Sequence, residues 1–150
     1  METLTRSKMT HVLIADDETH TRLSLSFILE SAGYLVTDAP DGQEALDKIL
    51  ALRRTSHPID LLVLDIEMPG LTGWELLDEL EEQNIFLPTI IITGFSDSPT
   101  RGKFSEGCRV EIILKPFTPQ RLTTSVSNLL QNKKPSGQDG KWEAPSSRYT

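Results

Sequence analysis

Short apolar runs alternate with amphipathic segments from His11 to Leu130. This alternation is typical of βαβ units that build a mostly parallel sheet. The apolar runs predict five strands, at residues 11–15, 34–38, 59–64, 88–93 and 110–114. Four of the five are dense in Val, Ile or Leu, as strands covered by helices on both faces usually are. The pattern therefore predicts a doubly wound α/β fold with a five-stranded parallel sheet flanked by helices.

The amphipathic segments predict five helices, at about residues 19–32, from 41, at 73–83, at 97–107 and from 118. In the first helix Leu23 and Phe27 lie one turn apart, and Gly33 can cap the end. The fourth helix is expected to be short or irregular, because Pro99 and Gly102 both disfavour a helix interior.

Capping signals mark two helix starts. Asp41 followed by Glu44 has the spacing of a capping box, and Thr118 can cap a helix whose first residue is Pro119. Trp74 is more simply explained as part of the core than as a binding site. The expected inward positions of the last three clear helices are Ala45, Leu46, Ile49 and Leu50; Trp74, Leu77 and Leu80; and Leu122, Val126, Leu129 and Leu130.

Length and composition indicate one folded domain. The chain has 150 residues, of which 37% are apolar and 25% charged, as in globular proteins. We expect a domain at residues 10–131 between a disordered leader, 1–9, and a disordered tail, 132–150. The segment after Gln131 has no apolar period that could repay the entropy of ordering. The domain is expected to act alone.

Net charge, the lack of long apolar runs and the cysteine count limit the classes of binding partner and indicate the cellular compartment. A net charge of −7 argues against direct nucleic-acid binding, which needs clustered Lys and Arg. The leader lacks the apolar run of a secretory signal, and no stretch is apolar for long enough to span a bilayer. The single cysteine, Cys108, fits a reducing cytoplasm. We therefore expect a cytoplasmic protein that binds a cation or a protein surface rather than a membrane.

Carboxylates directly follow two of the predicted strands. Asp16 and Asp17 come after the first strand, and Asp65 comes after the third. Ligands of open α/β sheets bind beyond the carboxyl ends of the strands, so these acids are expected to meet there. Clustered carboxylates repel one another unless they are protonated or neutralised by a cation. A hard ion with oxygen ligands, Mg²⁺ above all, suits such a group.

Two further strand ends carry a hydroxyl and an ammonium group. Thr93 ends the fourth strand, and Lys115 follows the fifth, directly before Pro116. A hydroxyl donor and a cation aimed at one point can hold the oxygens of a transferred phosphoryl group, where stabilising charge is most of the catalytic task. The combination with the acids indicates phosphoryl chemistry.

In chain order the motifs are Asp16-Asp17, Asp65 with Met68-Pro69-Gly70, Thr93, and Lys115-Pro116-Phe117. This series resembles the response-regulator receiver domain of two-component signalling, over roughly Thr10 to Asn132. The resemblance implies a flavodoxin-like fold. It also implies that Asp65 accepts a phosphoryl group from a histidine kinase or phosphotransfer protein.

The same resemblance implies the roles of the other residues. Asp17 and Asp65 would bind Mg²⁺ directly and Asp16 through water, and the backbone carbonyl of Glu67 would supply a further ligand. Thr93 and Lys115 would contact the phosphoryl group. With the four magnesium ligands they make up the expected site of six residues.

Such a domain acts only on itself, through its own phosphotransfer and dephosphorylation, and is not expected to be an enzyme in the ordinary sense. It would switch binding to a downstream protein, with a phosphorylation-dependent homodimer as a further possibility. The family often has an aromatic residue three positions before the lysine, where this chain has Ile112. A switch that rotates an aromatic ring is therefore not expected. Phe95 can equally gate the site or pack in a loop.

Two rival functions stay open at the level of sequence. The first is an interaction module with the same fold that is never phosphorylated, which Ile112 and the irregular fourth helix favour. The second is a phosphatase with Asp65 as nucleophile and Glu67 as general acid, although no substrate-enclosing cap is evident. Taken singly, Asp16 and Asp17 could also be a helix N-terminal signal, since the helix dipole favours negative charge there.

Overall fold

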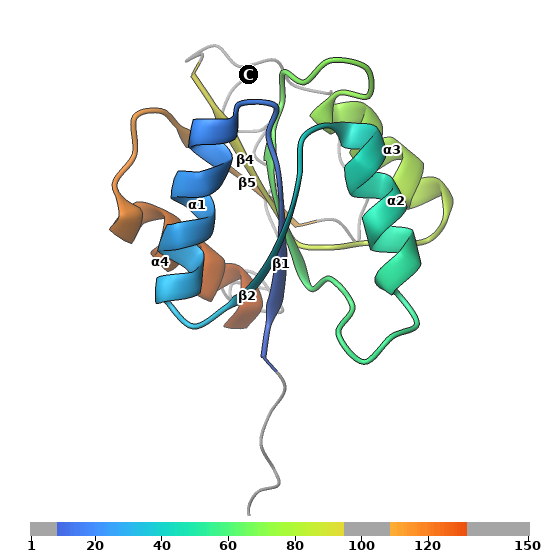
Figure 1. Cartoon of the computed structure of the whole chain (residues 1–150), viewed down its shortest axis with the longest axis horizontal. Helices are drawn as coiled ribbons and strands as arrows, with labels where there is room; N and C mark the ends of the chain where they lie inside the picture. Colours follow the sequence, from blue (N-terminus) through green and yellow to red (C-terminus); the bar gives the residue numbers. More distant parts are fainter. Residues whose placement is uncertain (1–8, 95–108, 132–150) are drawn as a thin grey trace, which may run out of the picture.

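Five parallel strands form one sheet in the order β2-β1-β3-β4-β5 (Figure 1). The strands are β1 (His11–Ala15), β2 (Leu35–Ala39), β3 (Leu61–Asp65), β4 (Thr89–Thr93) and β5 (Val110–Leu114). The structure is a computed structural model that describes residues 9–94 and 109–131. It confirms the predicted five-stranded doubly wound fold, with strand bounds that differ from the sequence estimate by two residues at most. Because the strand order reverses at β1, the carboxyl ends of β1 and β3 lie side by side.

Helices cover both faces of the sheet. They are α1 (Thr19–Ser31), α2 (Gly42–Leu52), α3 (Gly73–Glu82) and α4 (Pro119–Gln131). Figure 1 shows α1 and α4 on one side of the sheet and α2 and α3 on the other, and each pair is in contact. The irregular helix expected at residues 97–107, Phe95, the leader up to residue 8 and the tail lie outside the described residues. The domain limits thus stay predictions.

The core consists of two apolar layers, one on each face of the sheet. Side chains alternate along β1, so that Val12 and Ile14 face α1 and α4 while Leu13 and Ala15 face α2 and α3. All five residues of β1 are buried, as expected for a central strand between two helical layers. The predicted inward positions of α2, α3 and α4 are buried or packed against these layers, with Trp74 only partly buried.

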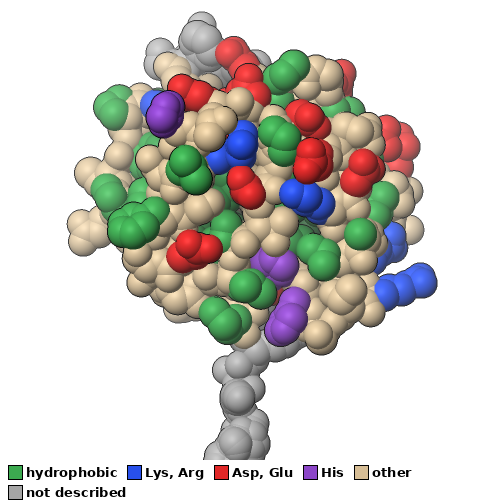
Figure 2. Space-filling view, in the orientation of Figure 1, with side chains coloured by type: hydrophobic (Ala, Val, Ile, Leu, Met, Phe, Trp, Pro, Cys, Tyr) green, Lys and Arg blue, Asp and Glu red, His purple; other side chains and the backbone are tan. Residues whose placement is uncertain are grey.

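The apolar pair that helped to predict α1, Leu23 and Phe27, does not face the core. Leu23 and Phe27 are 60% and 71% exposed, whereas Leu25 and Leu29 are 2% and 0% exposed and pack in the core. Figure 2 shows hydrophobic side chains at the surface on the side of the molecule where α1 lies. The helix contains two apolar stripes with the same four-residue spacing, and the sheet contacts the one that spacing alone did not single out.

The helix starts and ends largely follow the capping signals. The Asp41 carboxylate accepts a hydrogen bond from Glu44 N at 2.8 Å, and the Thr118 hydroxyl accepts one from Arg121 N at 3.0 Å. Gly33 ends α1 with a φ of 98°, a conformation that glycine adopts without strain. These bonds satisfy N–H groups that a helix start leaves without partners.

Two local features shape the region after β3: the capped start of α3 and the close approach of α2 to the loop before α3. The helix α3 begins with a complete capping box between Thr72 and Glu75, which the sequence reading overlooked. At the start of α2, a Cβ placed on Gly42 would overlap the backbone oxygen of Leu71 and lie 2.9 Å from its Cβ. Only glycine therefore allows α2 to approach the loop between β3 and α3 this closely.

A buried histidine lies at the amino-terminal edge of the sheet. His11 is 4% exposed; its Nδ1 donates to the backbone oxygen of His57 at 2.8 Å, and its Nε2 lies 2.7 Å from the Thr37 hydroxyl. Its backbone N–H donates to Asp60 at 2.9 Å. The His11 ring is therefore a paired part of the core edge.

No helix among residues 9–94 and 109–131 combines the length and the apolar character needed to cross a membrane.

Candidate functional site

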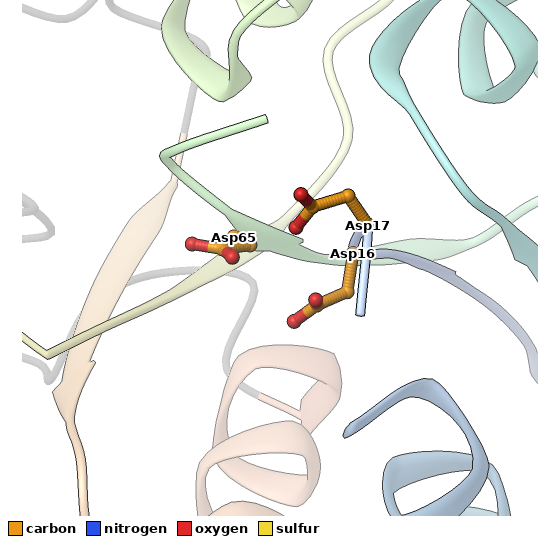
Figure 3. Close-up of side chains that lie close together, drawn as sticks. All are labelled: Asp16, Asp17 and Asp65. Atoms are coloured by element: carbon orange, nitrogen blue, oxygen red, sulfur yellow. The ribbon is translucent and has the colours of Figure 1, made fainter. Parts of the chain in front are cut away.

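Three carboxylates meet at the carboxyl ends of β1 and β3. Asp16 and Asp17 directly follow β1, and Asp65 is the last residue of β3, next to the point where Ala15 pairs with Leu64. One carboxylate oxygen of each acid lies within 4.8 Å of the others. Figure 3 shows the three side chains converging beyond the ends of the strands. The structure thus brings together acids that lie 48 positions apart in the sequence, Asp17 and Asp65.

The three acids differ in their exposure to water. Asp16 is 2% exposed, Asp65 is half-buried and Asp17 is exposed. Asp16 Oδ1 accepts a hydrogen bond from Glu18 N at 2.8 Å, and Asp65 Oδ1 accepts one from Glu67 N at 3.1 Å. Each of these bonds spans two residues and closes a turn directly after a strand. The backbone therefore fixes one oxygen of each carboxylate and orients the other.

Burial makes the ionised forms of Asp16 and Asp65 less favourable. Loss of water contact, together with repulsion from Asp16, raises the pKa of Asp65 to about 6, against the opposing effects of the Glu67 N–H and Lys115. Burial likewise raises the pKa of Asp16, opposed by the bond from Glu18 N and by Lys115. The group is thus a concentration of negative charge that a cation would relieve.

The predicted hydroxyl and ammonium residues lie at neighbouring strand ends. Thr93, 2% exposed, ends β4 and pairs with Leu114 of β5. Lys115 N donates to the Thr93 carbonyl oxygen at 2.8 Å, which keeps the two strand ends together. The Lys115–Pro116 peptide bond is cis. Because the Lys115 charge lowers the pKa of both Asp16 and Asp65, its ammonium group lies within electrostatic reach of the acids.

The loop after β3 carries Glu67. The Glu67 side chain is exposed, whereas Met68 beside it is 4% exposed and anchors the loop in the core. Ile66 O accepts hydrogen bonds from Met68 N and Gly73 N, both at 3.2 Å. These contacts fold the loop back onto the end of the strand.

Sequence reasoning missed an arginine beside the acids. Arg22 Nη1 donates to the backbone oxygen of Asp16 at 2.8 Å, and its Nε donates to Asp38 Oδ2 at 2.9 Å. A cation in the first turn of a helix, directly after a run of acids, was the available signal, because the helix dipole disfavours a positive charge there.

The donor set fits a magnesium ion. The cluster offers carboxylate oxygens only, which hard divalent cations prefer, and burial and neighbouring negative charges raise the pKa of Asp16 and of Asp65. A doubly charged ion bound among them would remove that repulsion. The geometry therefore suits Mg²⁺ better than a transition metal that prefers nitrogen or sulfur ligands.

A parallel sheet with acids at the ends of β1 and β3, and a Thr and a Lys at the ends of β4 and β5, defines a CheY-like signalling domain. The chain belongs to the response regulator receiver domain family, whose model matches residues 12–127. Receiver domains are signalling domains rather than ordinary enzymes, and they typically bind Mg²⁺ through an acidic cluster.

Two relatives show the extent of the similarity. The transcriptional regulatory protein FixJ of Bradyrhizobium diazoefficiens is 34% identical over 125 residues, which are 83% of this chain and 58% of FixJ. The response regulator SaeR of Staphylococcus aureus is 33% identical over 127 residues, 84% of this chain and 53% of SaeR. The chain thus spans about half the length of these relatives.

Solved structures agree with this assignment. A CheY-like receiver domain protein of Methanospirillum hungatei has a TM-score of 0.70 at 30% identity, covering 84% of this chain and 97% of that one. The response regulator TrrA of Thermotoga maritima, solved in complex with Mg²⁺-BeF, has a TM-score of 0.68 at 32% identity, covering 81% of this chain and 99% of that one.

Proposed function

We propose that this chain is a single-domain response regulator that accepts a phosphoryl group on Asp65 from a histidine kinase or a phosphotransfer protein. The observation that supports this most directly is the convergence of three carboxylates, within 4.8 Å of one another, at strand ends within electrostatic reach of Lys115. Among the three, Asp65 is partly open to water and has a pKa of about 6, so it is ionised at neutral pH and is more basic than an ordinary carboxylate.

Asp17 and Asp65 would bind Mg²⁺ directly, Asp16 would bind it through a water molecule, and the backbone carbonyl of Glu67 would complete the protein's share of the ligands. The ion supplies positive charge that offsets the charge on the phosphoryl oxygens. The related TrrA, solved in complex with Mg²⁺-BeF, supports the proposal of a Mg²⁺ site in this chain.

In the transfer itself, an oxygen of Asp65 attacks the phosphorus atom of a phosphohistidine. A new P–O bond forms as the P–N bond breaks, and the donor nitrogen leaves with the electron pair. Lys115 offsets charge on one phosphoryl oxygen, and the Thr93 hydroxyl donates to another. The hydrogen bond between Lys115 N and Thr93 O couples these two residues through the backbone.

The phosphorylated state is read out by a protein partner. Movement of Thr93 toward the phosphoryl group changes the surface around the ends of β4 and β5, because the modification adds negative charge and strong acceptor oxygens. Ile112 is 7% exposed and belongs to the core, so the readout proceeds without a rotating aromatic ring at this position. We place the protein in the cytoplasm, with residues 10–131 as the working domain and a homodimer as one output of phosphorylation.

Incubation with acetyl phosphate and Mg²⁺, followed by intact-mass measurement, tests the proposal. We expect the parent chain to gain the mass of one phosphoryl group and Asp65→Asn to gain none. Asp47→Asn is the matched control, because Asp47 is exposed on α2 and hydrogen-bonded only to Gln43 among the described residues. It should label like the parent.

The outcomes separate the rival functions. No mass gain in the parent chain would favour a receiver-fold interaction module that is never phosphorylated, the rival that Ile112 supports. Continuous release of product from a generic phosphate ester would instead favour a phosphatase. A mass gain that survives in Asp65→Asn would assign the phosphoacceptor to another residue.

A further inference from the structure

The start of α1 lacks the features that normally stabilise a helix N-terminus. Its N-cap residue, Glu18, makes no side-chain capping bond, and its first turn contains no acid. The same region contains Arg22, whose charge the helix dipole disfavours there. The helix α3, which begins near the same edge of the sheet, has a full capping box. Helix stability therefore does not account for an arginine at this place.

The contacts of Arg22 explain its position. Its Nη1 donates to the backbone oxygen of Asp16 at 2.8 Å. This oxygen belongs to the peptide unit that joins Asp16 to Asp17, and a peptide unit is planar. A bond that fixes the oxygen therefore also fixes the plane from which the Asp17 side chain extends. The Arg22 side chain is only 15% exposed, so water competes little for this bond.

A second set of contacts holds the guanidinium group itself. Arg22 Nε donates to Asp38 Oδ2 at 2.9 Å, and the backbone oxygen of Asp38 accepts a bond from Lys48 Nζ at 2.7 Å. The neighbouring Ala39 accepts from Asp16 N at 3.2 Å. The backbone of Asp16 is thus bound to β2 twice. Its N–H donates to β2 directly, and its carbonyl oxygen is connected to β2 through Arg22.

We infer that Arg22 is a positioning residue, held by Asp38, which orients the Asp16–Asp17 peptide so that both carboxylates face Asp65 in a geometry that binds Mg²⁺. The role requires a guanidinium group, whose planar fork donates in two directions from one rigid unit. A lysine keeps the charge but cannot make both bonds in this geometry. The inference rests on the proposed Mg²⁺ site and adds the residue that shapes it.

Positioning and simple electrostatics predict opposite results. Coulomb's law alone says that removing a positive charge beside a cation site strengthens cation binding. Positioning says that Arg22→Gln weakens Mg²⁺ binding, and that Arg22→Lys weakens it despite keeping the charge. We expect a loss of about tenfold in affinity for either variant, the scale seen when residues that orient metal ligands are changed.

The experiment is a Mg²⁺ titration of the full chain, followed by the amide NMR shift of Asp17. Arg54→Gln is the control, because Arg54 is exposed beyond the far end of α2 and its loss changes the net charge equally. It should change the affinity by less than about twofold, since salt screens distant exposed charges. A purely structural role for Arg22 would lower the free energy of unfolding and leave the affinity of the folded protein unchanged.

A second pair of variants decides the matter if Arg22→Lys does not fold, as judged by circular dichroism. Asp38→Ala and Asp38→Asn remove the same charge, but asparagine keeps an oxygen that can accept from Arg22 Nε. We expect Asp38→Ala to bind Mg²⁺ several times more weakly than Asp38→Asn; equal affinities would overturn the inference. Equal binding by parent and folded Arg22→Lys would also overturn it while leaving the proposed function intact. No Mg²⁺ binding by the parent would overturn both.

Discussion

Polar groups are buried at both edges of the sheet, but they are paired at one edge and in conflict at the other. At the amino-terminal edge, the His11 ring has a partner for each of its nitrogens, His57 O and Thr37 Oγ1. At the carboxyl-terminal edge, burial raises the pKa of both Asp16 and Asp65, and like charges raise it further, those of Asp16 and Asp17 on Asp65 and those of Asp17 and Glu18 on Asp16. At the amino-terminal edge, the folded chain itself thus supplies the hydrogen-bond partners of the buried ring.

The difference shows which part of the fold is organised for stability and which for a ligand. A buried polar group with partners costs little, whereas like charges held together destabilise the protein until a counter-ion arrives. Substitutions at the two edges should therefore have effects of opposite sign, and Mg²⁺ should act on one edge only.

The largest effect is expected at the paired edge. His11→Ala removes a buried ring and leaves two polar partners unsatisfied, which should lower the free energy of unfolding by about 3 kcal/mol. Urea unfolding measures this loss. His20→Ala removes an exposed histidine from α1 and should change the stability by less than about 0.5 kcal/mol. Similar losses in the free energy of unfolding for the two variants would show that the hydrogen bonds of His11 do not stabilise the fold.

The next largest effect is that of the ion. Mg²⁺ at 100 times its dissociation constant should raise the free energy of unfolding by about 2.7 kcal/mol, because it binds the folded chain only. Thermal unfolding in Ca²⁺-free buffer, with and without Mg²⁺, measures the increase. His11→Ala should keep the increase and Asp65→Asn should lose most of it. An increase of the same size in both variants would place the ion elsewhere.

The smallest effect comes from a matched pair of substitutions without Mg²⁺. At neutral pH, Asp65→Asn should raise the free energy of unfolding by about 1 kcal/mol, less than the ~3 kcal/mol of the full pKa shift because the group is partly exposed. Asp60→Ala, at the paired edge, should lower it, because Asp60 accepts the bond from His11 N and alanine cannot. Urea unfolding of both variants against the parent measures the two signs.

The effect of Asp65→Asn should also depend on pH. The pKa of Asp65 rises from 3.8 to about 6 on folding, so the folded chain binds the proton more tightly than the unfolded chain. The stability that this gives is present in full below the unfolded value and is lost as the pH rises through the folded value. The advantage of Asp65→Asn should therefore vanish in acid and grow on approaching neutral pH; an advantage that is constant with pH would contradict the assigned cause.

The sequence predicted those parts of the molecule that follow from local pattern and from one topological rule. Apolar runs located the strands, and the rule that parallel strand ends share an edge predicted that Asp16, Asp17 and Asp65 meet, as they do in the structure. Thr93 and Lys115 followed from the same rule. The roles of these residues rest on the family resemblance and stay predictions.

What the sequence did not predict depends on contacts between distant segments. Spacing could not choose between Leu23 with Phe27 and Leu25 with Leu29, because only the sheet selects the buried stripe. The partners of His11 lie 26 and 46 positions away, at Thr37 and His57, and no local signal connects them. The same holds for Arg22 and Asp38, which become neighbours only when β2 pairs with β1.

The near-contact between Gly42 and Leu71 bears on how this chain can vary. A methyl group at position 42 has no room unless the backbone at Leu71 shifts, and Leu71 belongs to the loop that leads from Asp65 to α3. Mutational tolerance at the first residue of α2 is thus set by a loop nearly thirty positions further along the chain. In a saturation library, position 42 should be depleted of every residue but glycine as strictly as the acids themselves, although it bears no reactive group.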